Sequence, residues 1–281
     1  MIEIAVAAHA ELGAGPTWDP VARRLIWVDV LTARVHLSDP ATGRQTVLDT
    51  GQHVGAAKPR EGGGLVVNLR DGVGLYDASG GFSWLAEDAV PGRRGNGAAV
   101  APDGALWAGT VRDDEEKGGG ALTRVAPDGT AETVVPDATA AGGTGWSPDG
   151  SLMYWTDSPT RRIDVFTVTD DGRVRDRRPF VDTADLTGSP DGMTVDAEGC
   201  VWAAFRNGGA VHRFTPDGAL DLTVEVPVSR PTACAFGGTD LTDLYITTAR
   251  TGLAPGAEPA AGSVLVLPGA GQGLPQPAFR G

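Results

Sequence analysis

The segment Trp146-Ser147-Pro148-Asp149-Gly150-Ser151-Leu152-Met153-Tyr154-Trp155-Thr156-Asp157 joins a Ser-Pro-Asp-Gly sequence to a short apolar run that ends in aspartate. Pro, Asp and Gly favour tight turns, each for its own backbone reason. A run of four to eight apolar and aromatic residues bounded by turn residues is typical of a β-strand. This segment therefore predicts a turn that leads directly into a strand.

The same pattern recurs at five other places along the chain. The six apolar runs are Leu25–Asp29, Gly64–Val67, Ala105–Gly109, Leu152–Asp157, Val201–Ala204 and Leu244–Thr247. With Trp27, Val67, Trp107, Trp155, Trp202 and Tyr245 as markers, the steps are 40, 40, 48, 47 and 43 residues. A period of this size is typical of one four-stranded blade of a β-propeller.

A second strand-like segment follows each of these runs, and no long stretch with helical periodicity interrupts the series. The second segments are Val35–Pro40, Gly74–Asp77, Leu122–Val125, Ile163–Phe166, Val211–Phe214 and Val264–Leu267. The sequence therefore predicts an all-β, six-bladed β-propeller with four antiparallel strands per blade, formed by residues 1–281 as a single domain. The Trp and Tyr markers are expected in the cores of the blades.

Composition and charge narrow the classes of partner. The chain has 281 residues, a formal net charge of −13 and 41% hydrophobic residues. Because a phosphate backbone would be repelled, nucleic acid is a poor candidate partner. No signal-peptide pattern or membrane-spanning run is present. The cysteines Cys200 and Cys234 lie in apolar segments and are expected to be buried reduced thiols. These features favour a cytoplasmic protein without a membrane partner, and they leave its oligomeric state open.

The repeats can be aligned on the residue that opens each turn, namely Trp18, Lys58, Val100, Trp146, Val195 and Phe236. The positions four residues earlier are Ala14, Val54, Asn96, Gly142, Asp191 and Thr232. In a propeller these positions begin the innermost strands, so their side chains should converge on one end of the central channel. A ring of oxygen ligands there could hold a hard divalent cation. This ring supplies only one carboxylate, one amide and one hydroxyl.

Several motifs resemble those of the regucalcin/gluconolactonase (senescence marker protein) family. Gly13–Pro20 resembles the family's G-E-G-P-x-W motif, Arg94–Gly97 its R-x-N-D motif, and Gly142–Gly150 its N-G-x-x-W-S-P-D-G motif. Ser189–Asp196 closely matches P-D-G-M-x-x-D, and the segments 234–238 and 245–250 resemble the last blade. The resemblance covers nearly the whole chain and implies the propeller fold.

The resemblance also implies lactonase chemistry at a divalent metal, calcium or a similar ion. In the family the motif Glu, the N-G Asn and the P-D-G Asp hold the metal, which polarises the lactone carbonyl and activates water. Here the Glu is Ala14, the Asn is Gly142, and the Asp after R-x-N is Gly97. Asp191 remains, with Asn96 and Arg94 beside it. Ala14 and Gly142 cannot coordinate through side chains, so Asp191 and Asn96 are the candidate ligands, and any metal is expected to bind weakly or not at all.

Five residues are candidates for chemistry. Asp191 is the candidate catalytic base, although Pro-Asp-Gly is also ordinary turn chemistry. Arg94 and Asn96 are candidates for binding substrate oxygens, because arginine suits carboxylates, but a loop ion pair would explain them too. His53 adjoins Val54 and could titrate near neutral pH. Asp114, in the charged insert Val111–Gly120, lies near the family's substrate-contacting acid.

Three functions are consistent with this pattern. The first is a lactonase-like hydrolase that acts on a small polar lactone or ester in the channel. The second is a metal-independent enzyme that uses Asp191, Arg94 and His53 for acid–base cyclisation or isomerisation of a metabolite. The third is a ligand-binding homologue without catalysis. One fold accommodates all three, so the site must decide between them.

Overall fold

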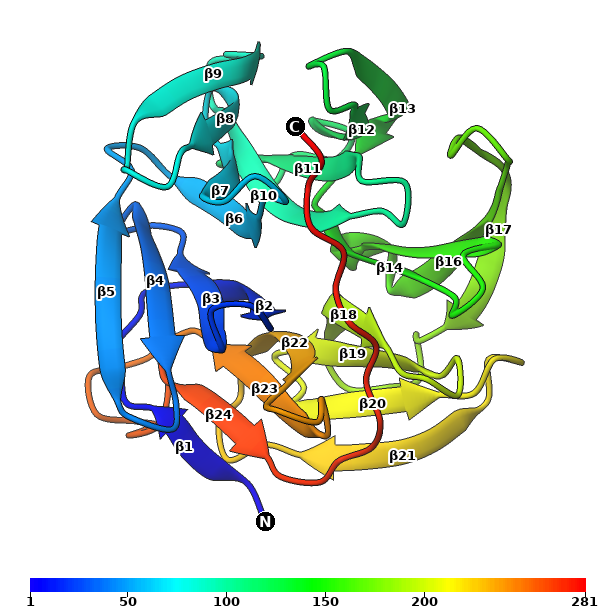
Figure 1. The fold of residues 1–281 in the computed structure, drawn as a ribbon. Helices are drawn as coiled ribbons and strands as arrows, with labels where there is room; N and C mark the ends of the chain where they lie inside the picture. The colour runs from blue at the N-terminus through cyan, green and yellow to red at the C-terminus, as the bar shows by residue number, and fades with distance from the viewer.

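The computed structural model describes residues 1–281 as six four-stranded antiparallel sheets arranged around a central channel (Figure 1). Five blades are continuous in sequence. They are β2 (Gly13–Asp19), β3 (Arg24–Asp29), β4 (Arg34–Asp39) and β5 (Arg44–Asp49); β6 (Val54–Pro59), β7 (Leu65–Leu69), β8 (Gly72–Tyr76) and β9 (Phe82–Glu87); β10 (Arg93–Val100), β11 (Leu106–Arg112), β12 (Gly120–Val125) and β13 (Ala131–Ala138); β14 (Ala141–Trp146), β15 (Leu152–Asp157), β16 (Arg162–Val168) and β17 (Val174–Asp182); and β18 (Ser189–Val195), β19 (Val201–Arg206), β20 (Ala210–Phe214) and β21 (Leu220–Glu225).

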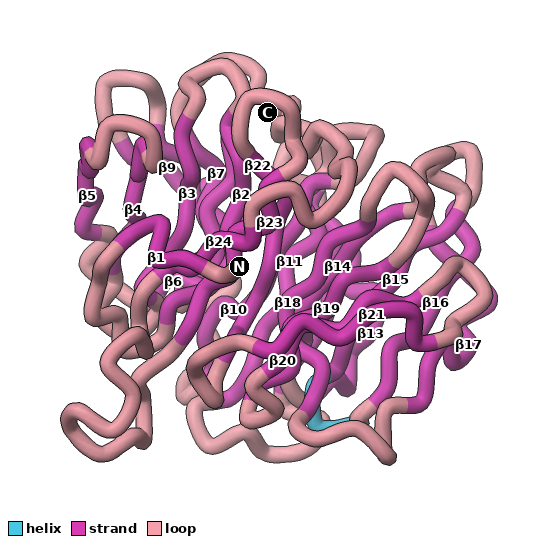
Figure 2. The backbone as a smooth tube through the Cα atoms, turned by 90° about the horizontal axis from the view of Figure 1, so that it is seen from below, coloured by secondary structure: helices cyan, strands magenta, loops and turns pink.

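The sixth blade joins the two ends of the chain. Its strands are β22 (Pro231–Gly237), β23 (Asp243–Thr248), β24 (Val264–Leu267) and, at the outer edge, the N-terminal strand β1 (Glu3–Val6). The only helical segment is η1 (Ser158–Thr160), a single 3₁₀ turn (Figure 2). The predicted six-bladed, all-β architecture is confirmed. The only helical segment is too short to cross a membrane.

The turns between strands explain why the quoted segment folds as it does. Asp149 Oδ1 accepts hydrogen bonds from the Ser147 hydroxyl at 2.6 Å and from the Ser151 backbone N–H at 3.1 Å. Gly150 has a φ of 72°, in the left-handed region that glycine occupies without steric cost. The aspartate and glycine thus fix the turn, and the apolar run then begins β15.

The hydrophobic core lies between neighbouring blades. The markers Trp27, Trp107, Trp155 and Trp202 are all fully buried in second strands, as predicted. Trp202 of β19, for example, packs edge-on against Phe236 of β22 at a centroid distance of 5.7 Å. Each blade therefore buries its apolar face against the next blade and holds the six inner strands at fixed positions around the channel.

Each inner strand carries a β-bulge near the end where it enters the channel. In β6 the bulge lies between Val54 and Ala56, and Gly55 rather than Val54 lines the channel pocket. Gly55 therefore takes the place assigned to Val54, which is fully buried in the blade core. Lys58 pairs with Val66 of β7 and lines the pocket, as Ala99, Thr194 and Ala235 of other inner strands do.

Residues 268–281 form a C-terminal tail that crosses one end of the propeller (the red segment in Figure 1). The tail hydrogen-bonds to blade 5 through Ala197 N–H to the Gln272 carbonyl at 2.8 Å. It reaches blade 2, where Phe279 exchanges backbone hydrogen bonds with Pro59 and Glu61, each at 2.9 Å. Because these contacts lie at the ends of the inner strands, the tail covers the channel end opposite to Asn96 and Asp191.

Candidate functional site

One pocket occupies the central channel, and its wall is built from the inner strands of all six blades. Asp191, Arg94, Asn96 and Lys58 line it together with Glu115. Gln276 of the C-terminal tail also lines the pocket. The pocket therefore opens at the end where the inner strands begin and reaches toward the tail.

Asp191 stands at the start of β18, where the Pro190-Asp191-Gly192 bulge aims it into the channel. Its backbone carbonyl accepts a hydrogen bond from the Thr156 hydroxyl at 2.9 Å, whereas its carboxylate has no hydrogen-bond donor from the protein. Burial raises the pKa of this carboxyl to about 6, against the opposing charges of Arg206 and Arg94. A carboxylate that is exposed only to the channel, without a partner, is suited to accept a proton from a bound molecule.

Arg94 and Asn96 lie on β10 and face the same pocket. Arg94 is buried, and its guanidinium donates to the Gly95 carbonyl at 3.1 Å and lies 3.5 Å from Asn96 Oδ1. Asn96 Nδ2 donates to the Ala141 carbonyl at 2.9 Å, which fixes the amide between blades 3 and 4. The structure thus brings together three of the five candidate residues, namely Asp191, Arg94 and Asn96.

Asp114 lies outside the pocket. Its carboxylate is on the exposed side of the insert, bound by Arg112 at 2.6 and 2.9 Å, and these bonds lower its pKa to about 2. The neighbouring Glu115 lines the pocket instead, and its carboxylate lies 3.5 Å from Arg206 of β19. The charged insert therefore does reach the channel mouth, through the residue that follows the predicted one.

His53 also lies outside the pocket wall. Its Nδ1 is 3.0 Å from Arg70, which follows the C-terminal end of β7, and burial together with that guanidinium lowers the histidine pKa. Arg70 in turn pairs with Asp113 at 3.1 Å. His53 thus belongs to a charged group beside the channel mouth and does not share a wall with Asp191.

The oxygen donors at the family's metal position are few. Ala14 and Gly142 line the pocket without a side-chain oxygen. A Cβ at Gly142 would lie 2.9 Å from Thr156 Oγ1 and 3.3 Å from Asp191 Oδ1, so these groups already crowd the space where a larger side chain would stand. Asn96 Oδ1 faces the Arg94 guanidinium. Calcium takes six to eight oxygen ligands. This ring offers one carboxylate, one amide that is already engaged, and the Thr232 hydroxyl, which donates to the Gly13 carbonyl at 2.5 Å.

Lys58 is a functional candidate that the sequence pattern did not reveal. Its ammonium enters the channel from β6, donates to Thr17 Oγ1 of blade 1, and lies 3.5 Å from the Gly15 carbonyl. Burial lowers its pKa to about 8, and it has no carboxylate partner. A signal was present in the sequence: the chain has only two lysines, Lys58 and Lys117, and Lys58 stands in an apolar strand.

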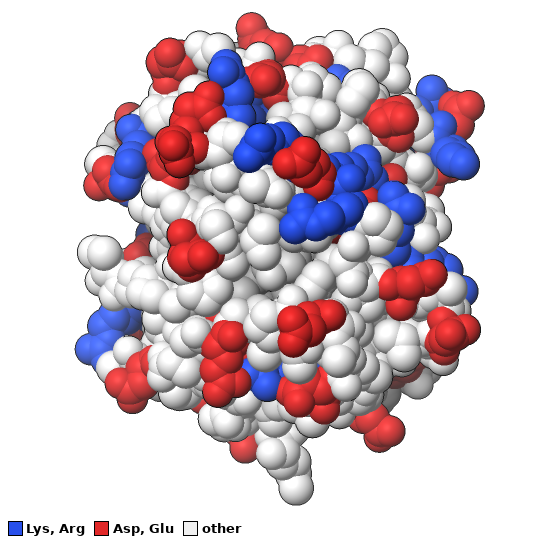
Figure 3. Space-filling view, turned by 90° about the vertical axis from the view of Figure 1, so that its right-hand side faces the viewer, with Lys and Arg blue, Asp and Glu red and all other residues white.

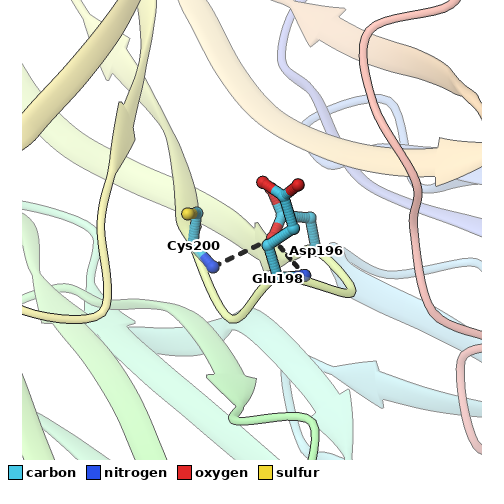
Figure 4. A group of neighbouring side chains, drawn as sticks. All are labelled: Asp196, Glu198 and Cys200. Carbon is cyan, nitrogen blue, oxygen red and sulfur yellow. Dashed lines mark hydrogen bonds between the residues drawn. The ribbon is translucent and has the colours of Figure 1, made fainter.

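Asp196, Glu198 and Cys200 form a second acidic group, in the turn between β18 and β19 (Figure 4). Asp196 Oδ1 accepts from the backbone N–H groups of Glu198 and Cys200 at 3.0 and 2.9 Å. Its Oδ2 accepts from Trp202 Nε1 at 2.8 Å and from Arg213, which also pairs with Glu198. Both carboxylates already accept from strong donors, so this group stabilises the turn between β18 and β19. The two cysteines are free and buried, as predicted.

Comparison with known proteins agrees with this geometry over nearly the whole chain. Residues 12–250 match the profile of the SMP-30/Gluconolactonase/LRE-like region. A 6-deoxy-6-sulfogluconolactonase from Pseudomonas putida is 35% identical over 89% of this chain and 87% of its own. A pentonolactonase from Haloferax volcanii is 35% identical over 87% of this chain and 84% of its own. The crystal structure of regucalcin from Agrobacterium tumefaciens, described as a calcium-binding protein, superposes with a TM-score of 0.94 at 30% identity, covering 99% and 96%. The chain belongs to the SMP-30/gluconolactonase family.

Proposed function

We propose that this protein is a lactonase that hydrolyses a small sugar-derived lactone in the central channel. The observation that carries the proposal is the unpaired Asp191 carboxylate in a pocket that also presents Arg94 and Asn96. The names of the relatives at 35% identity, which act on gluconolactone and pentonolactone derivatives, support this substrate class.

The chemistry follows from the residues present. A water molecule attacks the lactone carbonyl carbon while Asp191 accepts its proton. The ring C–O bond then breaks, and the proton passes to the leaving alkoxide to give the hydroxy acid. Arg94 and Asn96 bind hydroxyl or carbonyl oxygens of the substrate and hold the lactone in place.

We further propose that hydrolysis does not depend on a tightly held metal. Two of the three ligand positions lack oxygen donors, and Arg94 places a positive charge beside the remaining amide. The free buried cysteines support the proposal of a cytoplasmic location, because thiols are kept reduced in that compartment.

A panel of sugar 1,4-lactones tests the function. Release of the acid would be measured after treatment with chelator and again with added calcium, manganese or zinc. We expect chelator-resistant turnover of at least one lactone. Turnover only with added metal would contradict metal independence but leave the lactonase proposal standing. No turnover under any condition would overturn the lactonase proposal, and binding of the lactones without turnover would favour a ligand-binding role.

A further inference from the structure

The buried lysine is the least expected charge in the channel. Lys58 is 8% exposed, and the other lysine, Lys117, is on an exposed loop. Its only hydrogen-bond acceptors are two neutral oxygens, Thr17 Oγ1 and the Gly15 carbonyl. A buried ammonium without a carboxylate is costly, and a neutral side chain would avoid that cost. A binding or catalytic task is the simplest reason for retaining it.

The surroundings of Lys58 leave room for a ligand. Several inner-strand residues that line the same pocket have short side chains, namely Ala98, Ala99, Thr144, Thr194 and Ala235. Thr144 and Thr194, both buried, line the same pocket, and their hydroxyl groups have no hydrogen-bond partner. The pocket thus presents an ammonium among short side chains, which suits a small ligand with an electron-rich oxygen.

The ammonium lies beside the start of β2 and lines the same pocket as Asp191. Gly15, whose carbonyl Lys58 approaches, directly follows Ala14. Ala14 belongs to the ring of inner-strand starts that contains Asn96, Gly142 and Asp191. The lysine thus brings a positive charge next to the ring from which oxygen donors are missing.

We propose that the Lys58 ammonium binds the carbonyl oxygen of the lactone and the carboxylate of the acid that the lactone becomes. When water attacks the carbonyl carbon, the π electrons of the C=O bond move to that oxygen, and Lys58 stabilises the resulting negative charge. Asp191 takes the proton of the water, and the ring oxygen leaves and takes up a proton, so no other reactant is needed. This inference rests on the proposed lactonase function and assigns to Lys58 the stabilisation of the negative charge that forms on the carbonyl oxygen.

Protonation of Lys58 suits this role. Burial alone accounts for its lowered pKa of about 8; the other charged groups of the pocket, Asp191, Arg94, Glu115 and Arg206, do not contribute to that shift. The ammonium is therefore the main form at pH 7, and it is lost as the pH rises through 8.

The experiment compares Lys58→Met and Lys58→Arg with the control Lys117→Met, which removes the exposed lysine. Hydrolysis of a 1,4-lactone would be followed at pH 7 in chelator, with the spontaneous rate subtracted. We expect Lys58→Met to lower kcat at least ~100-fold, Lys58→Arg to retain part of the activity, and Lys117→Met to match the wild type. The wild-type rate should fall above pH 8, and Lys58→Arg should not show this fall. Activity of Lys58→Met within about twofold of the wild type would overturn the proposal.

A binding measurement separates this inference from the function on which it rests. Calorimetric titration with the aldonate product, such as gluconate, should show roughly tenfold or more weaker binding to Lys58→Met than to the wild type. Equal affinity would overturn the role of Lys58 even if the enzyme is active. If the wild type hydrolyses no lactone, the lactonase proposal fails, while the same titration still decides whether Lys58 holds an anionic oxygen. Should Lys58→Met not fold, as judged by circular dichroism, Lys58→Gln and the wild-type pH profile decide the question in its place.

Discussion

Asp191 and Lys58 illustrate two ways in which a channel keeps a charged group available. The carboxylate of Asp191 has no donor in the protein, and the ammonium of Lys58 has only neutral acceptors. Charged groups in a folded interior normally have an opposite charge close by. Their lack of such partners agrees with the proposal that each acts on a molecule bound in the pocket.

Replacement of Asp191 tests the base directly. Asp191→Asn keeps the shape of the side chain but cannot accept the proton of the attacking water. We expect kcat for lactone hydrolysis to fall at least ~100-fold, as for loss of a general base. Thermal unfolding would serve as the control, since the Thr156 hydrogen bond goes to the backbone carbonyl of residue 191 and is unaffected. Unchanged kcat would show that Asp191 is only a turn residue.

Replacement of Lys58 should stabilise the fold while it impairs activity. The folded-state pKa of about 8 lies below the ordinary value of 10.5, so the unfolded chain binds more protons between these values. Burial of the Lys58 ammonium therefore lowers the free energy of unfolding by its full amount below pH 8. This cost disappears as the pH rises to 10.5. At pH 7 we expect Lys58→Met to raise the free energy of unfolding by about 3 kcal/mol, from the roughly 1.36 kcal/mol carried by each pKa unit.

Urea unfolding at pH 7 and at pH 10 would measure this effect. The gain should be smaller at pH 10, where most of the penalty of the wild-type lysine has gone. A loss of stability in Lys58→Met at pH 7 would instead indicate that the bond to Thr17 is structural.

Among the elements, the turn between β18 and β19 carries the most connected side chain outside the channel. Asp196 is 1% exposed and binds two backbone N–H groups, Trp202 and Arg213. Arg213 keeps Glu198 and Asp221, but Asp196→Ala removes the acceptor of two backbone N–H groups and of the Trp202 indole. Because each unsatisfied buried donor costs about 1–3 kcal/mol, we expect a loss of about 3 kcal/mol in the free energy of unfolding. Asp149→Ala removes the exposed aspartate at the equivalent turn of the previous blade and is the matched control, with a smaller expected loss. Similar losses in both variants would contradict the special role of the buried network.

The elements also show how far the sequence could predict the structure. The six blades were predictable because apolar runs and Asp-Gly turns recur at a nearly constant spacing, and turn and strand chemistry are local. Asp191 and Asn96 were placed in one pocket because they sit at equivalent positions of the repeat, and Arg94 was added because it precedes Asn96 in the Arg94–Gly97 motif. Lys58 served only to align the repeats, since the spacing of apolar residues does not show that its side chain enters the channel.

Other site residues depended on long-range contacts that no local pattern encodes. The insert between β11 and β12 turns Glu115, at a φ of 54°, toward Arg206, while Asp114 faces Arg112. The path of residues 268–281 across the propeller was not predicted, because that segment has neither strand periodicity nor helical periodicity. Its position depends on side chains such as Phe279, which packs between blades 2 and 3.

At the scale of the whole molecule, charges are spread over the outside. On the side formed by β16 and β17, basic groups gather in a band with acidic groups around it (Figure 3), and Arg177 there pairs with Asp164 at 2.7 Å. The positive charges of the proposed site, Lys58 and Arg94, lie inside the channel pocket rather than on the outer surface.

The C-terminal tail ties blades together over a long distance. Phe279 is fully buried among Val66 and Val73 of blade 2 and Val100 and Leu106 of blade 3. We expect Phe279→Ala to lower the free energy of unfolding by about 3–5 kcal/mol, as for other buried phenylalanines. Denaturant titration measures this loss, and Leu222→Ala, at an exposed position on β21, is the control. A loss below about 1 kcal/mol would show that the tail only rests on the surface.

The pairing of β1 with β24 has a consequence for synthesis of the protein. Val6 pairs with Val264, so the first strand must wait for 258 further residues before its partner exists. At roughly 5–20 residues per second on the ribosome, this wait lasts on the order of 13–50 s. During that time the ring of blades stays open, and the face of the first blade that later packs against the sixth blade is exposed. The newly made chain is therefore most open to association with other chains before its last blade is complete.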